Sequence, residues 1–141
     1  MAETLIERLH AQGVDASGFR AAQLTRDAVE HAGIVVAATR QHRAQVVRYG
    51  NELAERTFTL AQLARLLSSA PSAPRATDLE APPAAGLASA ALGARGLRAG
   101  GAMSDDDLDD PWRRSRRTYR RVADRIDDLL VPIVAELAAG V

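Results

Sequence analysis

Two short stretches of the chain hold the residues whose types and spacing could support chemistry. The first is Ser104 to Trp112, SDDDLDDPW, in which five aspartates come before a proline and a tryptophan. Proline restricts the preceding residue to extended backbone, so Pro111 limits the directions in which the Asp110 carboxyl can point. The second is the turn Thr39 to Arg43, TRQHR, which follows an apolar run. Taken alone, the acidic stretch also fits a solvated turn that caps the following helix, so its role stays open at this point.

The elements around the second stretch predict where it lies. Residues 34–38, IVVAA, are apolar and rich in β-branched side chains, which is typical of a buried strand. Thr39 is a suitable N-cap for a helix over residues 40–48. A buried strand, a polar turn and a helix make the repeating unit of an open α/β sheet, in which ligands bind at the carboxyl ends of the strands. We therefore expect Thr39 to Arg43 on the rim of a site; alternatively, the turn is only a connector.

Helical and strand periodicities account for most of the remaining chain. Apolar residues at spacings of three and four, capping residues and alternation predict the following elements: a helix over 2–12, a short helix after Thr25, a strand over 56–60, a helix from Thr59 and a long helix over 114–139. Residues 68–103 are rich in alanine, proline and glycine. They predict a flexible insertion, with a brief helical turn around 84–94.

Composition limits the class of protein. A length of 141 residues with 47% hydrophobic residues suits one domain with a core of its own. The net charge is zero, so we expect no nucleic acid or membrane partner. No apolar run is long enough to span a membrane and the N-terminus lacks a signal-peptide pattern, so we expect a cytoplasmic protein. The chain has no cysteine, which excludes disulfides, thiolate metal sites and a cysteine nucleophile. Its three histidines fall in different predicted elements, so we expect neither a metal nor another cofactor.

Four segments carry a resemblance to a known family: GFRAAQLT at 18–25, IVVAATRQHR at 34–43, RTFTL at 56–60 and DDPW at 109–112. In this order and spacing they resemble the low-molecular-weight protein tyrosine phosphatases, including the arsenate-reductase-like actinobacterial branch. The resemblance covers most of the chain apart from residues 68–103. It implies an α/β fold in a single domain over residues 1–141, a partial doubly wound parallel sheet. The family's first βαβ unit is missing from it, as in a domain truncated at its N-terminus.

The resemblance also implies a role for Asp110. In this family, the aspartate of an Asp-Pro-aromatic motif protonates the leaving tyrosine oxygen, and Asp110, Pro111 and Trp112 match that motif. Asp110 is therefore the candidate general acid. The family's nucleophile is a cysteine in a phosphate-binding loop with an arginine, and this sequence contains no such loop. We expect a phosphatase-like protein that is inactive as written. A longer form with the cysteine loop would act on phosphotyrosine proteins or small phosphate esters.

A non-catalytic alternative remains open. The acidic loop and the arginine-rich C-terminal helix would then form the binding surface of an interaction or regulatory module. Seven arginines between Arg113 and Arg125 could bind phosphate or nucleic acid, but Asp124, Asp127 and Asp128 are interleaved at helical spacing. This pattern favours a solvated, salt-bridged helix face. Loss of the family's first strand would also leave the edge of residues 34–38 exposed, so we expect self-association through that edge.

Overall fold

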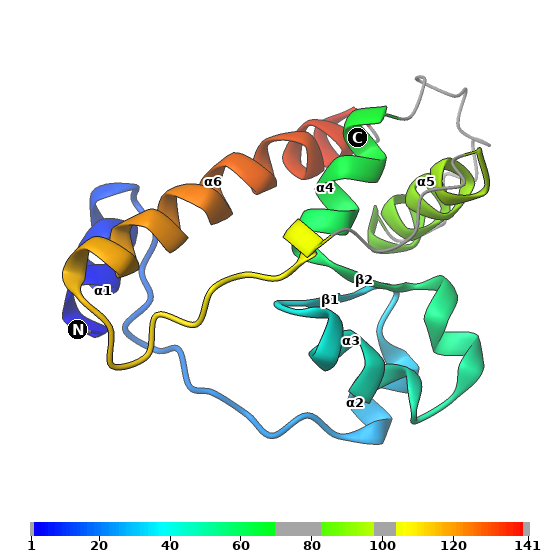
Figure 1. Cartoon of the computed structure of the whole chain (residues 1–141), viewed down its shortest axis with the longest axis horizontal. Helices are drawn as coiled ribbons and strands as arrows, with labels where there is room; N and C mark the ends of the chain where they lie inside the picture. The colour runs from blue at the N-terminus through cyan, green and yellow to red at the C-terminus, as the bar shows by residue number, and fades with distance from the viewer. Residues whose placement is uncertain (1, 70–82, 98–103, 140–141) are drawn as a thin grey trace.

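The computed structural model describes residues 2–69, 83–97 and 104–139 and is mostly helical, with a small parallel sheet of two strands (Figure 1). In chain order, the elements are α1 (Ala2–Ala11), α2 (Arg26–His31), β1 (Val35–Ala37), α3 (Arg40–Val47), η1 (Asn51–Glu55), β2 (Thr57–Thr59), α4 (Leu60–Ser69), α5 (Pro83–Leu97), η2 (Ser104–Asp106) and α6 (Arg116–Ala138). The η elements are short 3-10 helices. The coarse prediction of a mixed α/β fold is therefore confirmed.

The unit β1–α3–β2 forms the centre of the fold. The two strands run parallel, with Val35 opposite Thr57 and Ala37 opposite Thr59. Thr39 caps α3, because its hydroxyl oxygen accepts a hydrogen bond of 3.1 Å from the His42 N–H group. The predicted strand, turn and helix are thus confirmed, with the cap at the expected residue. The strands are shorter than predicted, at three residues each.

Helices cover both faces of this sheet. Figure 1 shows α4 and α5 on one side of the strands and α2 and α3 on the other. The larger core cluster lies on the first side, where Phe58 packs with α4, α5 and Ile133 of α6. A smaller cluster on the second side joins Val29, Val46 and Leu53, with Val35 packed against it. The buried side chains therefore form two layers separated by the strands, as expected when a sheet buries both faces.

Residues 83–97 differ from the expected flexible insertion. They form α5, a helix of 15 residues that contributes Leu87, Ala88, Ala91 and Ala94 to the larger core cluster. Ala91 is fully buried. The three alanines recur at intervals of three, so this face of α5 can pack closely against its neighbours. Residues 68 and 69 belong to α4, and 70–82 and 98–103 lie outside the described residues.

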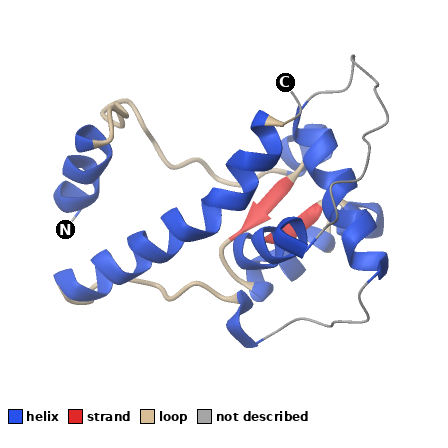
Figure 2. Cartoon of the chain, turned by 90° about the horizontal axis from the view of Figure 1, so that it is seen from above, coloured by secondary structure: helices blue, strands red, loops and turns tan. Residues whose placement is uncertain are grey.

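The longest helix, α6, extends from the core to the N-terminal helix. It continues through Pro132, and its buried residues include Tyr119, Val122 and Ile133. Figure 2 shows that its N-terminal half projects away from the strands. There, Arg8 of α1 forms an ion pair of 2.7 Å with Asp124. A further ion pair, with Asp127, holds the same arginine. Thus α1 is linked to the body of the fold through α6.

Phe58 supplies a test of this core. Its side chain is fully buried between α4 and α5, and replacement by alanine would leave a cavity. We expect Phe58→Ala to lower the free energy of unfolding by about 3–5 kcal/mol, measured by urea denaturation. Phe19, which is 75% exposed, is the matched control, and Phe19→Ala should change the free energy by less than about 0.5 kcal/mol. Equal effects of the two substitutions would contradict this core.

Candidate functional site

The acidic loop, defined here as residues 105–110, lies at the carboxyl end of β1. The backbone N–H group of Leu108 donates a hydrogen bond of 2.9 Å to the Ala38 carbonyl, directly after the strand. One residue earlier, Asp107 accepts from the Arg40 backbone N–H group at 2.6 Å and from the Arg40 guanidinium at 2.9 and 3.1 Å. These contacts join residues separated by 67 positions in the sequence. The acidic loop and the β1–α3 turn therefore form one structure.

Arginines from three helices neutralise the acidic loop. The ion pairs are Asp105 with Arg125 at 3.2 Å, Asp106 with Arg65 at 2.9 Å, Asp107 with Arg40 at 2.9 Å and Asp109 with Arg121 at 2.8 Å. Asp106 is 3% exposed, so its charge is buried. A buried carboxylate is tolerated when it is paired and hydrogen-bonded, as Asp106 is with Arg65. The acidic loop is thus held to the fold by ion pairs, while Asp105, Asp109 and Asp110 stay exposed to solvent.

Asp110 is the aspartate of the loop for which the described part of the chain shows no ion pair. Its side chain is exposed, and its Oδ1 atom accepts a hydrogen bond of 2.9 Å from the Trp112 N–H group. This bond across Pro111 holds the carboxyl group against its own turn. The Asp110 carboxylate is thus accessible to solvent, while the residues before it in the loop are held by ion pairs.

A pocket of about 700 Å³ opens in front of Asp110. Its walls come from α1, α6, the end of the acidic loop and the β1–α3 turn, which contributes Thr39, Gln41 and His42. Most of the remaining wall is apolar and includes Leu9 of α1 and Ile126 of α6. An apolar pocket with a few polar groups at one end is a common form of ligand site. The β1–α3 turn therefore borders a pocket, and its role as a site stays a prediction.

The two arginines of that turn, Arg40 and Arg43, do not line the pocket. Arg40 is engaged with Asp107, as described above. Arg43, expected on the rim, is turned toward the sheet, where its Nε atom donates to the Thr57 carbonyl at 2.8 Å. The expectation for Arg43 was wrong, because the backbone carbonyls beside β2 provide acceptors for a partly buried guanidinium. Sequence reasoning also missed α1 as a wall of the pocket, because nothing local indicates that Arg8 pairs with residues of α6.

Within residues 2–69, 83–97 and 104–139, no group of three histidine or acidic side chains is placed to hold a metal ion. In the same ranges, no helix is long and apolar enough to cross a membrane.

Comparison with known proteins gives no match for this chain: none of the family models, curated proteins or solved structures is similar to it.

Protonation of Asp107 should release the loop from the turn. Hydrogen bonds from Arg40 lower the pKa of Asp107 below its ordinary value. This anchor is therefore complete above the ordinary aspartate pKa, about 4, and is lost as the pH falls through the lowered value. We expect an NMR titration of the Asp107 carboxyl to give a lower midpoint in the wild type than in Arg40→Ala. Arg48→Ala, an exposed site at the opposite end of the same helix, should leave the midpoint unchanged; a shift as large as that of Arg40→Ala would contradict the assignment.

Proposed function

We propose that this chain carries the proton-donor part of a phosphate-ester-hydrolysing site of the low-molecular-weight protein tyrosine phosphatase type. The observation that carries the proposal is the fastening of the acidic loop to the carboxyl end of β1, which places Asp110 on the pocket beside Thr39 and His42. Parallel α/β sheets bind ligands at this end of their strands. The proposal includes the finer fold, in which β1 and β2 belong to a doubly wound parallel sheet.

Asp110 has the properties that a general acid on a rim requires. Its carboxyl group is exposed and forms no ion pair with the described residues. Asp110 also borders a pocket with space for an aromatic ring. A protonated carboxyl group there could donate to the leaving oxygen of a phosphate ester and later accept a proton from water. Thr39 and Gln41 offer a hydroxyl and an amide for orienting a ligand.

The 141-residue chain supplies no nucleophile of the family type. It contains no cysteine, and the family's chemistry begins with attack of a thiolate on phosphorus. We therefore propose that hydrolysis needs a longer form of the protein with a cysteine loop upstream of Met1. In that form, phosphotyrosine proteins or small phosphate esters would be the substrates. Without it, the chain would act as a non-catalytic binding module.

Hydrolysis of para-nitrophenyl phosphate and of phosphotyrosine tests the proposal. The 141-residue chain should give no turnover, whereas a form extended to an in-frame upstream cysteine loop should be active. In the extended form, we expect Asp110→Asn to lower kcat by about 10²–10⁴-fold on phosphotyrosine. The loss should be smaller on para-nitrophenyl phosphate, because its leaving group is more acidic and needs less protonation.

Asp105→Asn is the matched control, since it removes a carboxylate that is exposed, lies outside the pocket and pairs with Arg125. It should retain the kcat of the extended form. Equal losses from the two substitutions would remove Asp110 from the role of acid. Turnover by the 141-residue chain would require another nucleophile, and absence of any upstream cysteine loop would leave the binding-module alternative.

Self-association through β1 is a second part of the proposal. β1 pairs with β2 on one side, and the Val36 side chain is 46% exposed. An edge strand with an exposed apolar side chain can pair with another chain. We expect sedimentation velocity to show a concentration-dependent increase in mass that Val36→Lys reduces. Val14→Lys is the control, because Val14 is 49% exposed but lies in a loop; loss of association in both variants, or in neither, would contradict the use of this edge.

A further inference from the structure

Five exposed arginines gather where α6 begins. We call Arg113, Arg114, Arg116, Arg117 and Arg120 the arginine cluster; all are exposed. In the described ranges of the chain, none of the five forms an ion pair. The other arginines of this region, Arg121 and Arg125, are engaged with the acidic loop. The guanidinium groups of the cluster thus have no ion-pair partner in the described structure.

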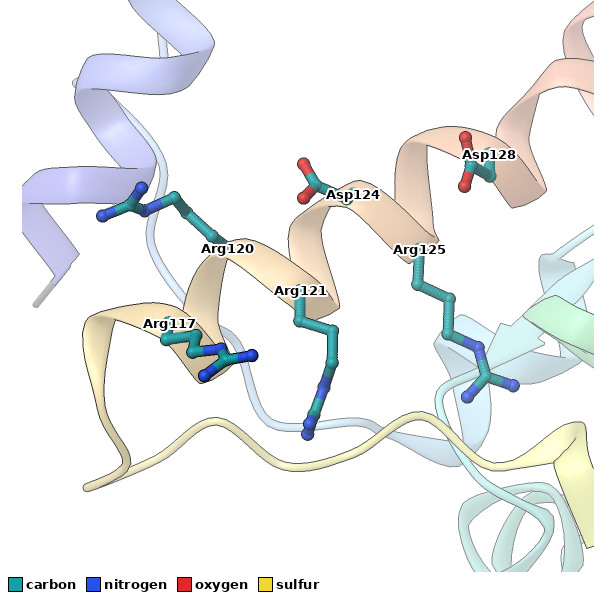
Figure 3. A pocket seen from close by; sticks show the side chains of 6 residues that line it. All are labelled: Arg117, Arg120, Arg121, Asp124, Arg125 and Asp128. Carbon is teal, nitrogen blue, oxygen red and sulfur yellow. The ribbon is translucent and has the colours of Figure 1, made fainter.

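Two aspartates of α6 that follow the cluster have another partner, which leaves fewer carboxylates for the cluster. Asp124 lies four residues after Arg120, at a favourable spacing for an ion pair within the helix, but it bonds to Arg8 of α1 at 2.7 Å. Asp127 is held by the same arginine. Figure 3 shows the Arg121 side chain extending toward the acidic loop, while Asp124 and Asp128 line the same hollow along α6. The salt-bridged helix face expected from the sequence is therefore not the arrangement found.

The position of the cluster is electrostatically unfavourable for the isolated chain. The N-terminus of a helix carries partial positive charge and favours acidic residues, yet the first turn of α6 contains none. Arg116 and Arg120, like Arg117 and Arg121, stand four residues apart, where like charges repel. An anion bound at this end would relieve both effects, since it would meet several guanidinium groups and the helix terminus together.

The surroundings indicate the size of that anion. Arg117 and Arg120 border an open hollow of about 770 Å³, shown in Figure 3, which also includes Asp124 and Asp128. On the other side, the cluster follows Asp109 and Asp110 in the chain. An extended polyanion such as a nucleic acid would meet these carboxylates on both sides. The zero net charge of the chain also gives no general attraction for one. A short anionic segment would contact the arginines alone.

We propose that the arginine cluster docks a short acidic segment of a partner protein through carboxylate or phosphate groups. Guanidinium groups bind both anions through paired hydrogen bonds. The proposal does not depend on phosphatase activity, because none of the five arginines is assigned to that chemistry. It gives the chain a protein-binding surface beside the pocket, whichever form of the protein carries it.

Fluorescence anisotropy with two labelled peptides tests this surface on the 141-residue chain at low ionic strength. One probe is a hexaglutamate peptide and the other is a glutamate-rich peptide with one phosphotyrosine; tighter binding of the second would identify phosphate as the preferred anion. We expect the double variant Arg116→Glu, Arg117→Glu to weaken binding of the preferred peptide about tenfold or more, as expected for the loss of charge-assisted contacts. The same variant should unfold at a higher temperature, because it places acidic residues in the first turn of α6.

Arg20→Glu, Arg48→Glu is the matched control, with the same change in net charge at two exposed arginines outside α6. It should retain most of the binding. The neutral variant Arg116→Gln, Arg117→Gln should also lose affinity while it folds normally by circular dichroism. Failure of the wild type to bind either peptide would overturn the proposal, as would an equal loss in the control. Tighter binding of an oligothymidylate than of both peptides would also overturn it and would indicate a nucleic-acid surface.

Discussion

The ion pair between Arg65 and Asp106 is the contact on which the position of the candidate site depends. Asp106 is almost fully buried, and a buried carboxylate without its partner would destabilise the folded state strongly. The acidic loop has little regular structure of its own, since η2 covers only its first residues. A shift of the loop along the fold would separate this pair. Its position is therefore determined by electrostatics at Asp106 and, from there, by the ion pairs that Asp105, Asp107 and Asp109 form with arginines of α3 and α6.

The same distribution of charges explains both the candidate pocket and the arginine cluster. Arginines of α3, α4 and α6 bind the acidic loop, while Asp124 and Asp127 of α6 bind Arg8. Each ion pair that holds one segment in place occupies a carboxylate, which is then not available to another arginine. The N-terminal turn of α6 is thereby left basic, and Asp110 is left exposed at the pocket. Arginine suits this arrangement because one guanidinium can bond to two carboxylates or to several carbonyls.

Arg95 contributes to the packing on the side of the sheet that α4 and α5 cover. Arg95 of α5 lies over the Phe58 ring at 4.5 Å and donates to the Ala54 carbonyl at 3.0 Å. Burial and the nearby charge of Arg43 lower the pKa of Arg95. Its Nε and Nη2 atoms are buried without a hydrogen-bond partner among the described residues. The contact with Phe58 therefore joins α5 to the sheet at some electrostatic cost, alongside the apolar packing of Ala91 and Leu87.

The elements that depend on near neighbours could be predicted from the sequence. Hydrophobic periodicity and capping residues indicated the strand and helix on either side of Thr39, the strand before α4 and the long helix α6. The sequence also placed the β1–α3 turn at a candidate site, and the structure brings Asp110 to the same pocket. The core helix α5 was expected only as a brief turn. Its buried face consists largely of alanines, whose weak hydrophobic signal does not stand out among prolines and glycines.

By itself, the sequence determined the local structure, the absence of a cysteine nucleophile and the presence of charges of both signs. Which arginine meets which aspartate was decided only by the tertiary structure. The ion pairs that hold the acidic loop join residues 12 to 67 positions apart. The sequence does not indicate which arginine pairs with which aspartate, because every arginine carries the same group and so does every aspartate. Local spacing favoured pairing of Arg120 with Asp124, yet Arg8 took that carboxylate from a distance of 116 residues. Propensities act between neighbours along the chain, whereas ion pairs depend on distances in space, which exist only after the helices have packed.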